Sequence, residues 1–313
     1  MESIIILLLA LGIDLVVGEF PPPLHPVVWM GKLTSLLGLR IAPRRGRRAQ
    51  LSYGVVVVVL VLAIFVVPAF FLLFYLRELN TVAYVLVGAF LLKSTFSVKE
   101  LRRAALRVKE LLEGGKLSRA RVEVKALVSR DTRRLDEPHL VSATIESVAE
   151  NTSDSFIAPL FFFLLFGVPG AIGYRVVNTI DAMIGYHGEY EYLGKFAARL
   201  DDGLNFIPAR LSGLVLVVAA FLLPMSGKKA WQVMLRDHDR TESINAGWPM
   251  SAAAGALRTR LEKVGYYGLG DANNPLAPQL IPSAVRLMGV SSLLWGGFCL
   301  VVEVMKLVFT AQV

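Results

Sequence analysis

The feature that most constrains this chain is a set of long apolar runs. The clearest of them extends from Gly54 to Leu76 and contains five consecutive valines, Val55 to Val59. Over all 313 residues, 55% are hydrophobic and the mean hydropathy is +0.57. An ordinary soluble domain is less apolar than this, so the sequence predicts several membrane-spanning helices.

Apolar and polar stretches alternate along the chain in a pattern that predicts an all-α fold. We expect a polytopic integral membrane helical bundle with amphipathic cytoplasmic helices, which forms a single membrane domain over residues 1–313. Spans are predicted near residues 4–17, 54–76, 81–98, 156–172, 206–225 and 290–309. The run within 156–172 is short, so it fits either a span or a re-entrant segment. Polar insertions are predicted at 93–155 and 226–286.

The charge pattern predicts how the chain enters the membrane. The formal net charge is +8, and much of the excess comes from Arg40, Arg44, Arg45, Arg47 and Arg48. Cytoplasmic loops are enriched in Lys and Arg, so we expect this cluster in the cytoplasm and a multi-pass protein of the cell (cytoplasmic) membrane. No aromatic residues interleave with these arginines, which argues against nucleic-acid binding. The single cysteine, Cys299, excludes a disulfide or a Cys-based zinc site within one chain.

Three carboxylates in one polar segment form a first candidate site. Glu146, Glu150 and Asp154 follow one another at intervals of four, which would place them on one stripe of a helix. Like charges at this spacing repel, so solvent or a cation should compensate them. Asn151 lies near the same stripe and could add a neutral oxygen ligand. The alternative is a solvated helix face, but the apolar run that begins at Phe156 makes it less favourable.

A second candidate site combines acids and amides from two neighbouring segments. Asn178 and Asp181 are three residues apart, Asp202 and Asn205 repeat that spacing, and Asp201 lies four residues before Asn205. Such oxygen ligands suit Mg²⁺, which binds few protein carboxylates together with substrate phosphates. The alternative is a network of interhelical hydrogen bonds. Two arginines, Arg199 and Arg210, bracket this set and could hold phosphate or carboxylate oxygens, or simply pair with the aspartates.

Other polar residues near the apolar runs have two interpretations each. Asp14 within the first run needs a partner, because an aspartate at membrane depth costs roughly 2.5–3.5 kcal/mol. His25 is more often a hydrogen-bonded structural group than a ligand. The segment Arg130-Asp131-Thr132 could bind an anion or form a capped loop with surface ion pairs. Trp248 after Asn245 could offer a stacking surface or be an interfacial tryptophan.

These segments together resemble a known family. The motifs that carry the resemblance are Asp14 with Gly18, His25-Pro26-Val27 with Gly31, Arg130-Asp131-Thr132, the segment from Glu146 to Asp154, the segment from Asn178 to Tyr186, Arg199-Leu200-Asp201-Asp202, Pro208-Ala209-Arg210, and Asn245-Ala246-Gly247-Trp248-Pro249. In this order they are similar to the CobD/CbiB family, the adenosylcobinamide-phosphate synthases of cobalamin biosynthesis. The chain departs from the usual family pattern at Glu19, Ala182 and Met250.

The resemblance implies an ATP- and Mg²⁺-dependent ligase-type reaction. Adenosylcobyric acid would join the amine of aminopropanol phosphate, or of threonine phosphate, to give adenosylcobinamide phosphate. The partners implied are the corrinoid, the phosphorylated amino alcohol and membrane lipid, and the chain could form a homo-oligomer or a complex with other membrane proteins of the pathway.

The resemblance also implies roles for individual residues. The catalytic candidates are Glu146, Glu150, Asp201, Asp202 and His25, and the proton acceptor could be Glu146, Glu150 or His25. The candidates for binding substrate and phosphate are Arg130, Asp131, Thr132, Arg199, Arg210, Arg236, Asn245 and Trp248. The candidates for binding Mg²⁺ are Glu150, Asn151, Asp154, Asn178, Asp181, Asp201, Asp202 and Asn205.

Two other functions fit parts of the sequence. A membrane prenyltransferase also binds magnesium diphosphate through helical Asn/Asp motifs, but it does not require the segment from Glu146 to Asp154. A non-catalytic membrane sensor or regulator on the same fold would not need to bind Mg-ATP. Dependence of ATP consumption on a corrinoid and an amine would distinguish the synthase from both.

Overall fold

The computed structural model describes residues 1–42, 46–185 and 191–311. Two residues of the predicted arginine cluster, Arg44 and Arg45, and Tyr186 of the family motif lie outside the described residues. The chain divides into two compact units. Unit 1 comprises residues 1–97, 158–205 and 298–313, and unit 2 comprises residues 98–157 and 206–297.

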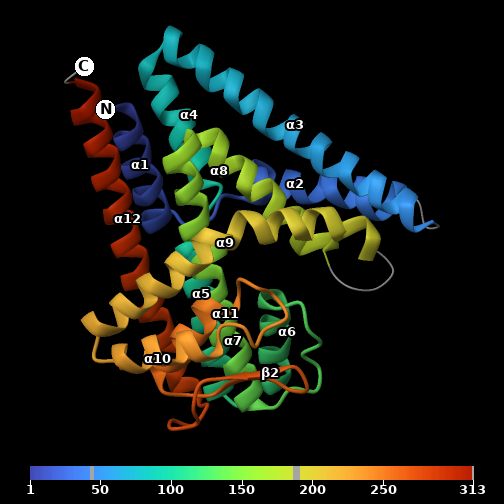
Figure 1. Cartoon of the computed structure of the whole chain (residues 1–313), viewed down its shortest axis with the longest axis vertical. Helices are drawn as coiled ribbons and strands as arrows, with labels where there is room; N and C mark the ends of the chain where they lie inside the picture. Colours follow the sequence, from blue (N-terminus) through green and yellow to red (C-terminus); the bar gives the residue numbers. More distant parts are fainter. Residues whose placement is uncertain (43–45, 186–190, 312–313) are drawn as a thin grey trace. The chain divides into compact units, whose positions relative to one another are not determined.

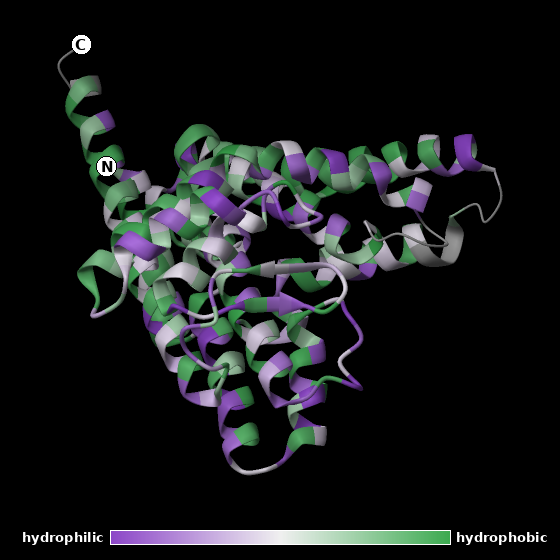
Figure 2. Cartoon of the chain, turned by 60° about the horizontal axis from the view of Figure 1, so that its bottom comes forward, coloured by the Kyte–Doolittle hydropathy of each residue, from purple (hydrophilic) through white to green (hydrophobic). Residues whose placement is uncertain are grey.

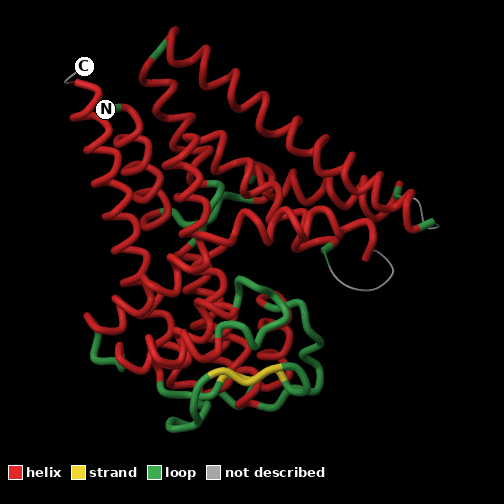
Figure 3. The backbone as a smooth tube through the Cα atoms, viewed as in Figure 1, coloured by secondary structure: helices red, strands yellow, loops and turns green. Residues whose placement is uncertain are grey.

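Nearly all the regular structure is helical (Figures 1 and 3). The helices in chain order are α1 (Glu2–Val16), α2 (Pro26–Thr34), α3 (Arg47–Leu79), α4 (Thr81–Lys93), α5 (Val98–Glu113), α6 (Leu117–Leu127), α7 (Glu137–Thr152), α8 (Ala158–Ile184), α9 (Glu191–Leu222), α10 (Gly227–Asp237), α11 (Gly247–Leu257) and α12 (Ile281–Ala311). Shorter turns of 3₁₀ or π type are η1 (Pro22–Leu24), η2 (Ser35–Ile41), η3 (Ser153–Ile157) and η4 (Pro278–Leu280). The all-α prediction is confirmed.

Within the described residues, five helical stretches are long and apolar enough to cross a membrane. They are Arg47–Leu79, Thr81–Glu113, Glu137–Ile184, Glu191–Leu222 and Pro278–Phe309. In Figure 2 hydrophobic residues dominate the long helices, whereas hydrophilic residues are frequent in the loops. Only 22% of the most apolar window of α3 is buried in the protein, so most of this helix presents apolar side chains outward. This confirms a polytopic membrane protein.

Unit 1 is held together by close contacts between long helices. Helix α1 packs on α4, and α3 packs on α8 (Figure 1). A close backbone approach lies where α3 meets α9: a Cβ atom at Gly54 would lie 2.1 Å from the carbonyl oxygen of Leu193. Only a residue without a side chain fits there, because the neighbouring atom belongs to the backbone.

Helix α8 reverses direction at Gly167. This glycine has φ 67° and ψ −162°, far from helical values, and Pro169 follows it. The rings of Phe162 and Tyr174 therefore stack with centroids 5.3 Å apart, whereas a straight helix would separate these positions by about 18 Å. The turn falls inside 156–172, the segment for which the sequence predicts a span or a re-entrant segment.

Unit 2 is a small helical domain with its own core. Alanine, valine and leucine side chains from α5, α6, α7, α10 and α11 form this core. Every residue of α11, apart from the partly buried Trp248, is buried, and the small side chains of this helix let α10 pack directly on it.

The hairpin of unit 2 was not predicted from the sequence. Strands β1 (Leu261–Lys263) and β2 (Tyr267–Leu269) pair in antiparallel register, with Glu262 opposite Gly268. They lie in the segment predicted only as a polar insertion, and β1 packs on α7. At three residues each, these strands are too short to show the alternation that identifies a strand in a sequence.

Candidate functional site

The predicted site residues belong to both units. Unit 1 holds His25, Asn178, Asp181, Arg199, Asp201, Asp202 and Asn205, and unit 2 holds Arg130, Asp131, Thr132, Glu146, Glu150, Asn151, Asp154, Arg210, Arg236, Asn245 and Trp248. The prediction that they share one divalent-ion pocket stays a prediction.

In unit 1, Asp201 lies at the centre of a hydrogen-bond network between α8 and α9. Asn205 Nδ2 donates to its Oδ2 at 2.9 Å, and Asn178 Nδ2 donates to its Oδ1 at 3.4 Å. The network continues outward, because the hydroxyl of Tyr174 donates to Asn205 Oδ1 at 2.8 Å and Arg175 Nη1 donates to Asn178 Oδ1 at 3.3 Å. Interhelical hydrogen bonding, one of the two interpretations of this set, is therefore present.

The remaining polar residues of this set flank the network. Asp181 lies one turn after Asn178, and its carboxylate lies against the backbone of Gly185. Asp202 is partly buried next to Asp201, and Arg199 is exposed one turn before it. Two residues that the sequence analysis missed, Tyr174 and Arg175, belong to the network. The cost of a charged residue in an apolar helix could have identified Arg175.

In unit 2, Glu146 is only 4% exposed and both of its carboxylate oxygens are occupied. Oε2 accepts hydrogen bonds from Arg130 Nη2 at 2.8 Å and from the Tyr267 hydroxyl at 2.7 Å. Oε1 accepts a hydrogen bond from Ser142 Oγ at 2.6 Å. Glu146 is thus a buried, charge-compensated group, and a solvated helix face is wrong for this residue.

The hairpin completes the Glu146 network. Ser142 Oγ accepts a hydrogen bond from the backbone N–H of Glu262 at 2.7 Å, so α7 binds β1 through Ser142 and β2 through Glu146. Burial and the charge of Glu146 raise the pKa of Tyr267, which keeps its phenol protonated as a donor. No spacing in the sequence connects Tyr267 with Glu146, and the sequence analysis missed it.

The other members of the first predicted set have different surroundings. Helix α7 ends at Thr152 and a π-helical turn follows, so Asp154 does not continue the regular α-helical stripe of Glu146 and Glu150. Asn151 Nδ2 donates to the Ser147 carbonyl at 3.0 Å, and Asn151 Oδ1 accepts from Ser155 Oγ at 3.0 Å. Glu150 and Asp154 are both partly buried.

Arg210 on α9 lies between two aromatic rings. Its guanidinium carbon is 3.6 Å from the ring centroid of Phe206 and 5.0 Å from that of Trp248. Nη1 donates to the Phe206 carbonyl at 2.6 Å and to Asn245 Oδ1 at 3.2 Å. In the part of the chain that the structure describes, no carboxylate lies within ion-pair distance of Arg210. A cation in an apolar helix without an acidic partner favours an anionic ligand.

The ring of Trp248 also stacks on the ring of His238, with centroids 3.9 Å apart. Its indole Nε1 is buried and makes no hydrogen bond within the described residues. Trp248 is therefore a component of a stack rather than an isolated interfacial side chain. The sequence analysis named Arg210, Asn245 and Trp248 but missed Phe206 and His238.

Arg236 is engaged in ion pairs with two aspartates. Arg236 pairs with buried Asp237 at 2.8 Å and with Asp271 at 3.0 Å. Burial would raise the pKa of Asp237, but hydrogen bonds from Arg236 and the Gly270 N–H lower it.

The loop 128–136 contains the other two predicted residues. Exposed Asp131 pairs with Arg133 at 2.7 Å, and buried Thr132 donates to the Arg121 carbonyl at 2.8 Å. Both contacts fit the capped-loop interpretation.

His25 uses both ring nitrogens in local contacts. Nδ1 accepts the N–H of Val27 at 3.2 Å, which caps α2, and Nε2 donates to the carboxylate of Glu19. Glu19 also lies 3.4 Å from the ammonium of Lys93, which is 0% exposed and 3.4 Å from Asp14 as well. Burial would raise the pKa of Glu19, but the His25 hydrogen bond and the Lys93 charge lower it to about 2. Lys93 is thus the partner that Asp14 requires.

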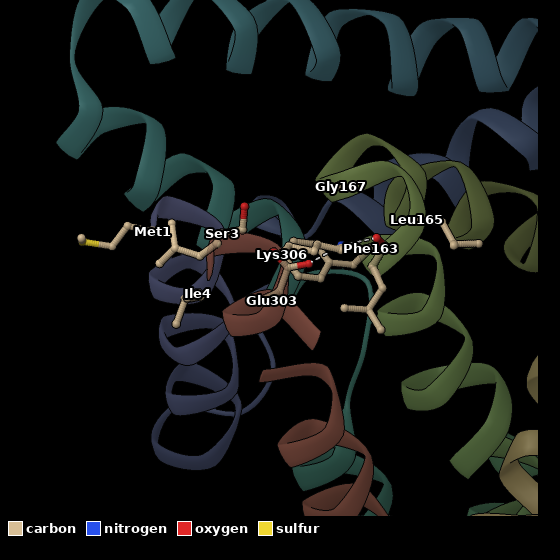
Figure 4. Close-up of a pocket in the computed structure, with 10 residues that line it drawn as sticks. Met1, Ser3, Ile4, Phe163, Leu165, Gly167, Glu303 and Lys306 are labelled. Carbon is tan, nitrogen blue, oxygen red and sulfur yellow. Dashed lines mark hydrogen bonds and ion pairs between the residues drawn. The ribbon is translucent and has the colours of Figure 1, made fainter. Parts of the chain in front are cut away.

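The Mg²⁺ site stays a prediction. Among residues 1–42, 46–185 and 191–311, no three His, Cys, Asp or Glu side chains form a group that could hold a metal ion by themselves. A cavity of about 290 Å³ in unit 1 lies at the tip of α8, next to Glu303 and Lys306 of α12 (Figure 4). None of the predicted site residues lines it.

Comparison with known proteins identifies the family. The family described as CobD/Cbib protein matches residues 7–288, about nine-tenths of the chain. The chain belongs to the CobD/CbiB family. The resemblance inferred from the sequence motifs is therefore confirmed.

Members of the CobD/CbiB family are similar to this chain over most of their length. The cobalamin biosynthesis protein CobD of Dehalococcoides mccartyi is 53% identical over 295 residues, which are 94% of this chain and 96% of the relative. A probable cobalamin biosynthesis protein CobD of Methanothermobacter thermautotrophicus is 41% identical over 94% of this chain and 96% of its own. A probable cobalamin biosynthesis protein CobD of Methanocaldococcus jannaschii is 39% identical over 85% of this chain and 88% of the relative. No solved structure matches the chain.

Proposed function

We propose that this chain is an adenosylcobinamide-phosphate synthase of the cell membrane. It joins the carboxyl group of adenosylcobyric acid to the amine of aminopropanol phosphate, or of threonine phosphate, with ATP and Mg²⁺. The observation that carries the proposal is membership of the CobD/CbiB family, whose similar members are named for cobalamin biosynthesis and align over almost the whole chain.

The oxygen donors of unit 1 have the chemistry to hold Mg²⁺. Asp201 is flanked by the amides of Asn178 and Asn205, and Asp181 and Asp202 lie on the same two helices. Carboxylate and amide oxygens are the ligands that Mg²⁺ takes in proteins, and it completes its shell with water and substrate phosphates. When bound, Mg²⁺ would neutralise the phosphate charge of ATP.

Among the predicted anion-binding residues, Arg210 is the best supported. Arg130 is already compensated by Glu146, and Arg236 by Asp237 and Asp271. Within the described residues, the neighbours of Arg210 are Asn245 and two aromatic rings, and no carboxylate lies within ion-pair distance. We therefore assign it to a phosphate or carboxylate of the substrates, with Trp248 as part of the same surface.

The proposed reaction has two steps. The substrate carboxylate attacks the terminal phosphorus of ATP, which releases ADP and forms an acyl phosphate. The amine then attacks the acyl carbon, inorganic phosphate leaves, and the amide forms. The amine must first lose its ammonium proton to a base. Glu146, Glu150 and His25 are the candidates for this base, and Glu146 and His25 also make the structural contacts described above.

The proposal is tested with the purified protein in detergent. It is incubated with adenosylcobyric acid, ATP, Mg²⁺ and each amine, and the corrinoid is analysed by mass spectrometry. We expect the mass of the amide product and one ADP per product. When the amine is omitted, we expect no product and no sustained turnover of ATP. ATP consumption that is independent of the corrinoid and the amine, or a melting temperature raised by an isoprenyl diphosphate and not by the corrinoid, would overturn it.

A further inference from the structure

A concave surface on α6 combines basic side chains that neither the family motifs nor the proposed reaction uses. Its volume is about 350 Å³, and its lining residues are Ser118, Arg121, Val122, Lys125, Thr132 and Arg133. We call it the α6 pocket. It lies entirely within unit 2, between α6 and the loop 128–136. This volume is at the lower end of the range for small-ligand sites.

The α6 pocket has an excess of positive charge. Arg121 and Lys125 are one turn apart on the same face of α6, where like charges repel by a few tenths of a kcal/mol. In the described part of the protein, neither has a carboxylate within ion-pair distance. Arg133 pairs with Asp131, and the nearby Glu123 of α6 pairs with Arg107 instead. The pocket therefore carries about two uncompensated positive charges.

Backbone contacts hold the two α6 cations in place. Arg121 donates through Nε to the Leu135 carbonyl at 2.9 Å, so its two terminal amino groups are not used by this contact. Lys125 Nζ donates to the Ser129 carbonyl at 2.9 Å and to the Arg130 carbonyl at 3.4 Å. The ordinary alternative is a solvated basic surface, but there long side chains move independently. Here the rim is fixed before a ligand arrives, which lowers the entropic cost of binding.

The loop that forms the other wall is also fixed. Buried Thr132 donates to the Arg121 carbonyl at 2.8 Å, and Arg133 is held by Asp131 through both its backbone N–H and its guanidinium. Ser118 adds a hydroxyl, and Val122 adds an apolar side chain that is 71% exposed. The pocket thus offers a guanidinium, an ammonium and a hydroxyl around one apolar group.

We propose that the α6 pocket binds the phosphate group of an organic phosphate monoester or of a lipid headgroup. Arginine and lysine supply the positive charge that a phosphate dianion requires, and the arginine fork matches its oxygens. Val122 contacts the carbon chain next to the phosphate. This binding does not require the proposed reaction.

The first test compares neighbouring arginines of the loop. Arg133 lines the α6 pocket, whereas Arg134 is exposed and does not. Binding of inorganic phosphate and of glycerol phosphate to the purified full-length protein is measured by calorimetry at constant ionic strength. We expect Arg133→Gln to weaken binding several-fold and Arg134→Gln to leave it unchanged. Equal effects of the two changes would overturn the proposal, because they would indicate only general surface charge.

A second pair of variants tests the helix side of the pocket. Arg121→Gln with Lys125→Gln is compared with Lys116→Gln with Arg119→Gln, which removes the same charge from the start of α6. The double substitution of Arg121 and Lys125 should weaken phosphate binding at least tenfold. The double substitution of Lys116 and Arg119, which is the control, should leave phosphate binding unchanged. Circular dichroism and melting temperature establish that each variant is folded. Should the pocket pair not fold, the Arg133 and Arg134 comparison decides.

The source of the phosphate is distinguished by a lipid arm. The protein is placed in nanodiscs of phosphatidylcholine alone or with phosphatidylglycerol, and co-purified lipid is measured. Binding of glycerol phosphate with no selective retention of phosphatidylglycerol identifies a soluble monoester. Selective retention of phosphatidylglycerol that Arg133→Gln abolishes identifies a lipid headgroup. Neither binding nor retention in the unaltered protein would refute the proposal.

Discussion

Tyr267 and Glu146 are joined by a hydrogen bond of 2.7 Å across 121 positions of the chain. The same carboxylate oxygen accepts a hydrogen bond from Arg130 Nη2. The hairpin of β1 and β2 and the loop 128–136 therefore both bind the buried carboxylate of Glu146 on α7. This relationship organises the part of unit 2 that contains Arg130-Asp131-Thr132 and the α7 part of the Glu146-to-Asp154 motif.

Replacing Tyr267 by Phe should weaken this region without changing its shape. The variant removes one donor from a buried carboxylate, which costs about 1–3 kcal/mol. Chemical denaturation in detergent would measure the loss. Tyr266→Phe is the matched control, because Tyr266 is exposed and contacts Lys263 rather than Glu146. An equal loss in both variants would contradict the role assigned to the Tyr267 hydroxyl.

Asp201→Asn should remove catalytic activity. The change keeps the side-chain shape but removes the negative charge, and loss of one preorganised electrostatic group typically lowers turnover about 100-fold or more. Turnover in the corrinoid assay and melting temperature are measured together. Asp239→Asn, at an exposed position after α10, is the control. Full activity of folded Asp201→Asn would remove this residue from the proposed metal and phosphate site.

Gly54→Ala should destabilise unit 1. The new Cβ would lie 2.1 Å from the Leu193 carbonyl oxygen, so α3 and α9 would have to separate. Overpacking of this kind costs about 1–3 kcal/mol. Gly12→Ala on α1, where no atom lies within 4 Å of the added carbon, should cause no loss. If both variants unfold at the same denaturant concentration as the original protein, the close approach is not present in solution.

Acid should destabilise the protein partly through Glu19. Its pKa in the folded protein is about 2, below the ordinary value of 4.5, so the unfolded chain takes up the proton first. The stabilisation is present above about pH 4.5 and is lost as the pH falls towards 2, with a total on the order of 3 kcal/mol. Glu19→Gln should flatten this part of the pH dependence, and Glu110→Gln at an exposed position should not. Unchanged pH dependence in Glu19→Gln would contradict the assignment.

Local patterns in the sequence were sufficient for the fold class. Apolar runs of about twenty residues are long enough to span the hydrocarbon core of a bilayer, so the membrane helices could be predicted from composition and length. The need of Asp14 for a partner also follows from the cost of a charge at membrane depth. The partner itself, Lys93, was assigned by the packing of α1 on α4.

Tertiary structure determined which polar residues form hydrogen bonds or ion pairs with one another. Spacing alone put Glu146, Glu150 and Asp154 on one stripe, but the π-helical turn after Thr152 and the burial of Glu146 under Tyr267 separate their roles. Likewise, spacing could not show that Arg236 pairs with two aspartates whereas Arg210 has no carboxylate within ion-pair distance among the residues that the structure describes. The periodicity of a sequence indicates on which side of its own helix a residue lies. The residue that it pairs with often belongs to a distant segment, and only the packing of the folded chain determines which segment that is.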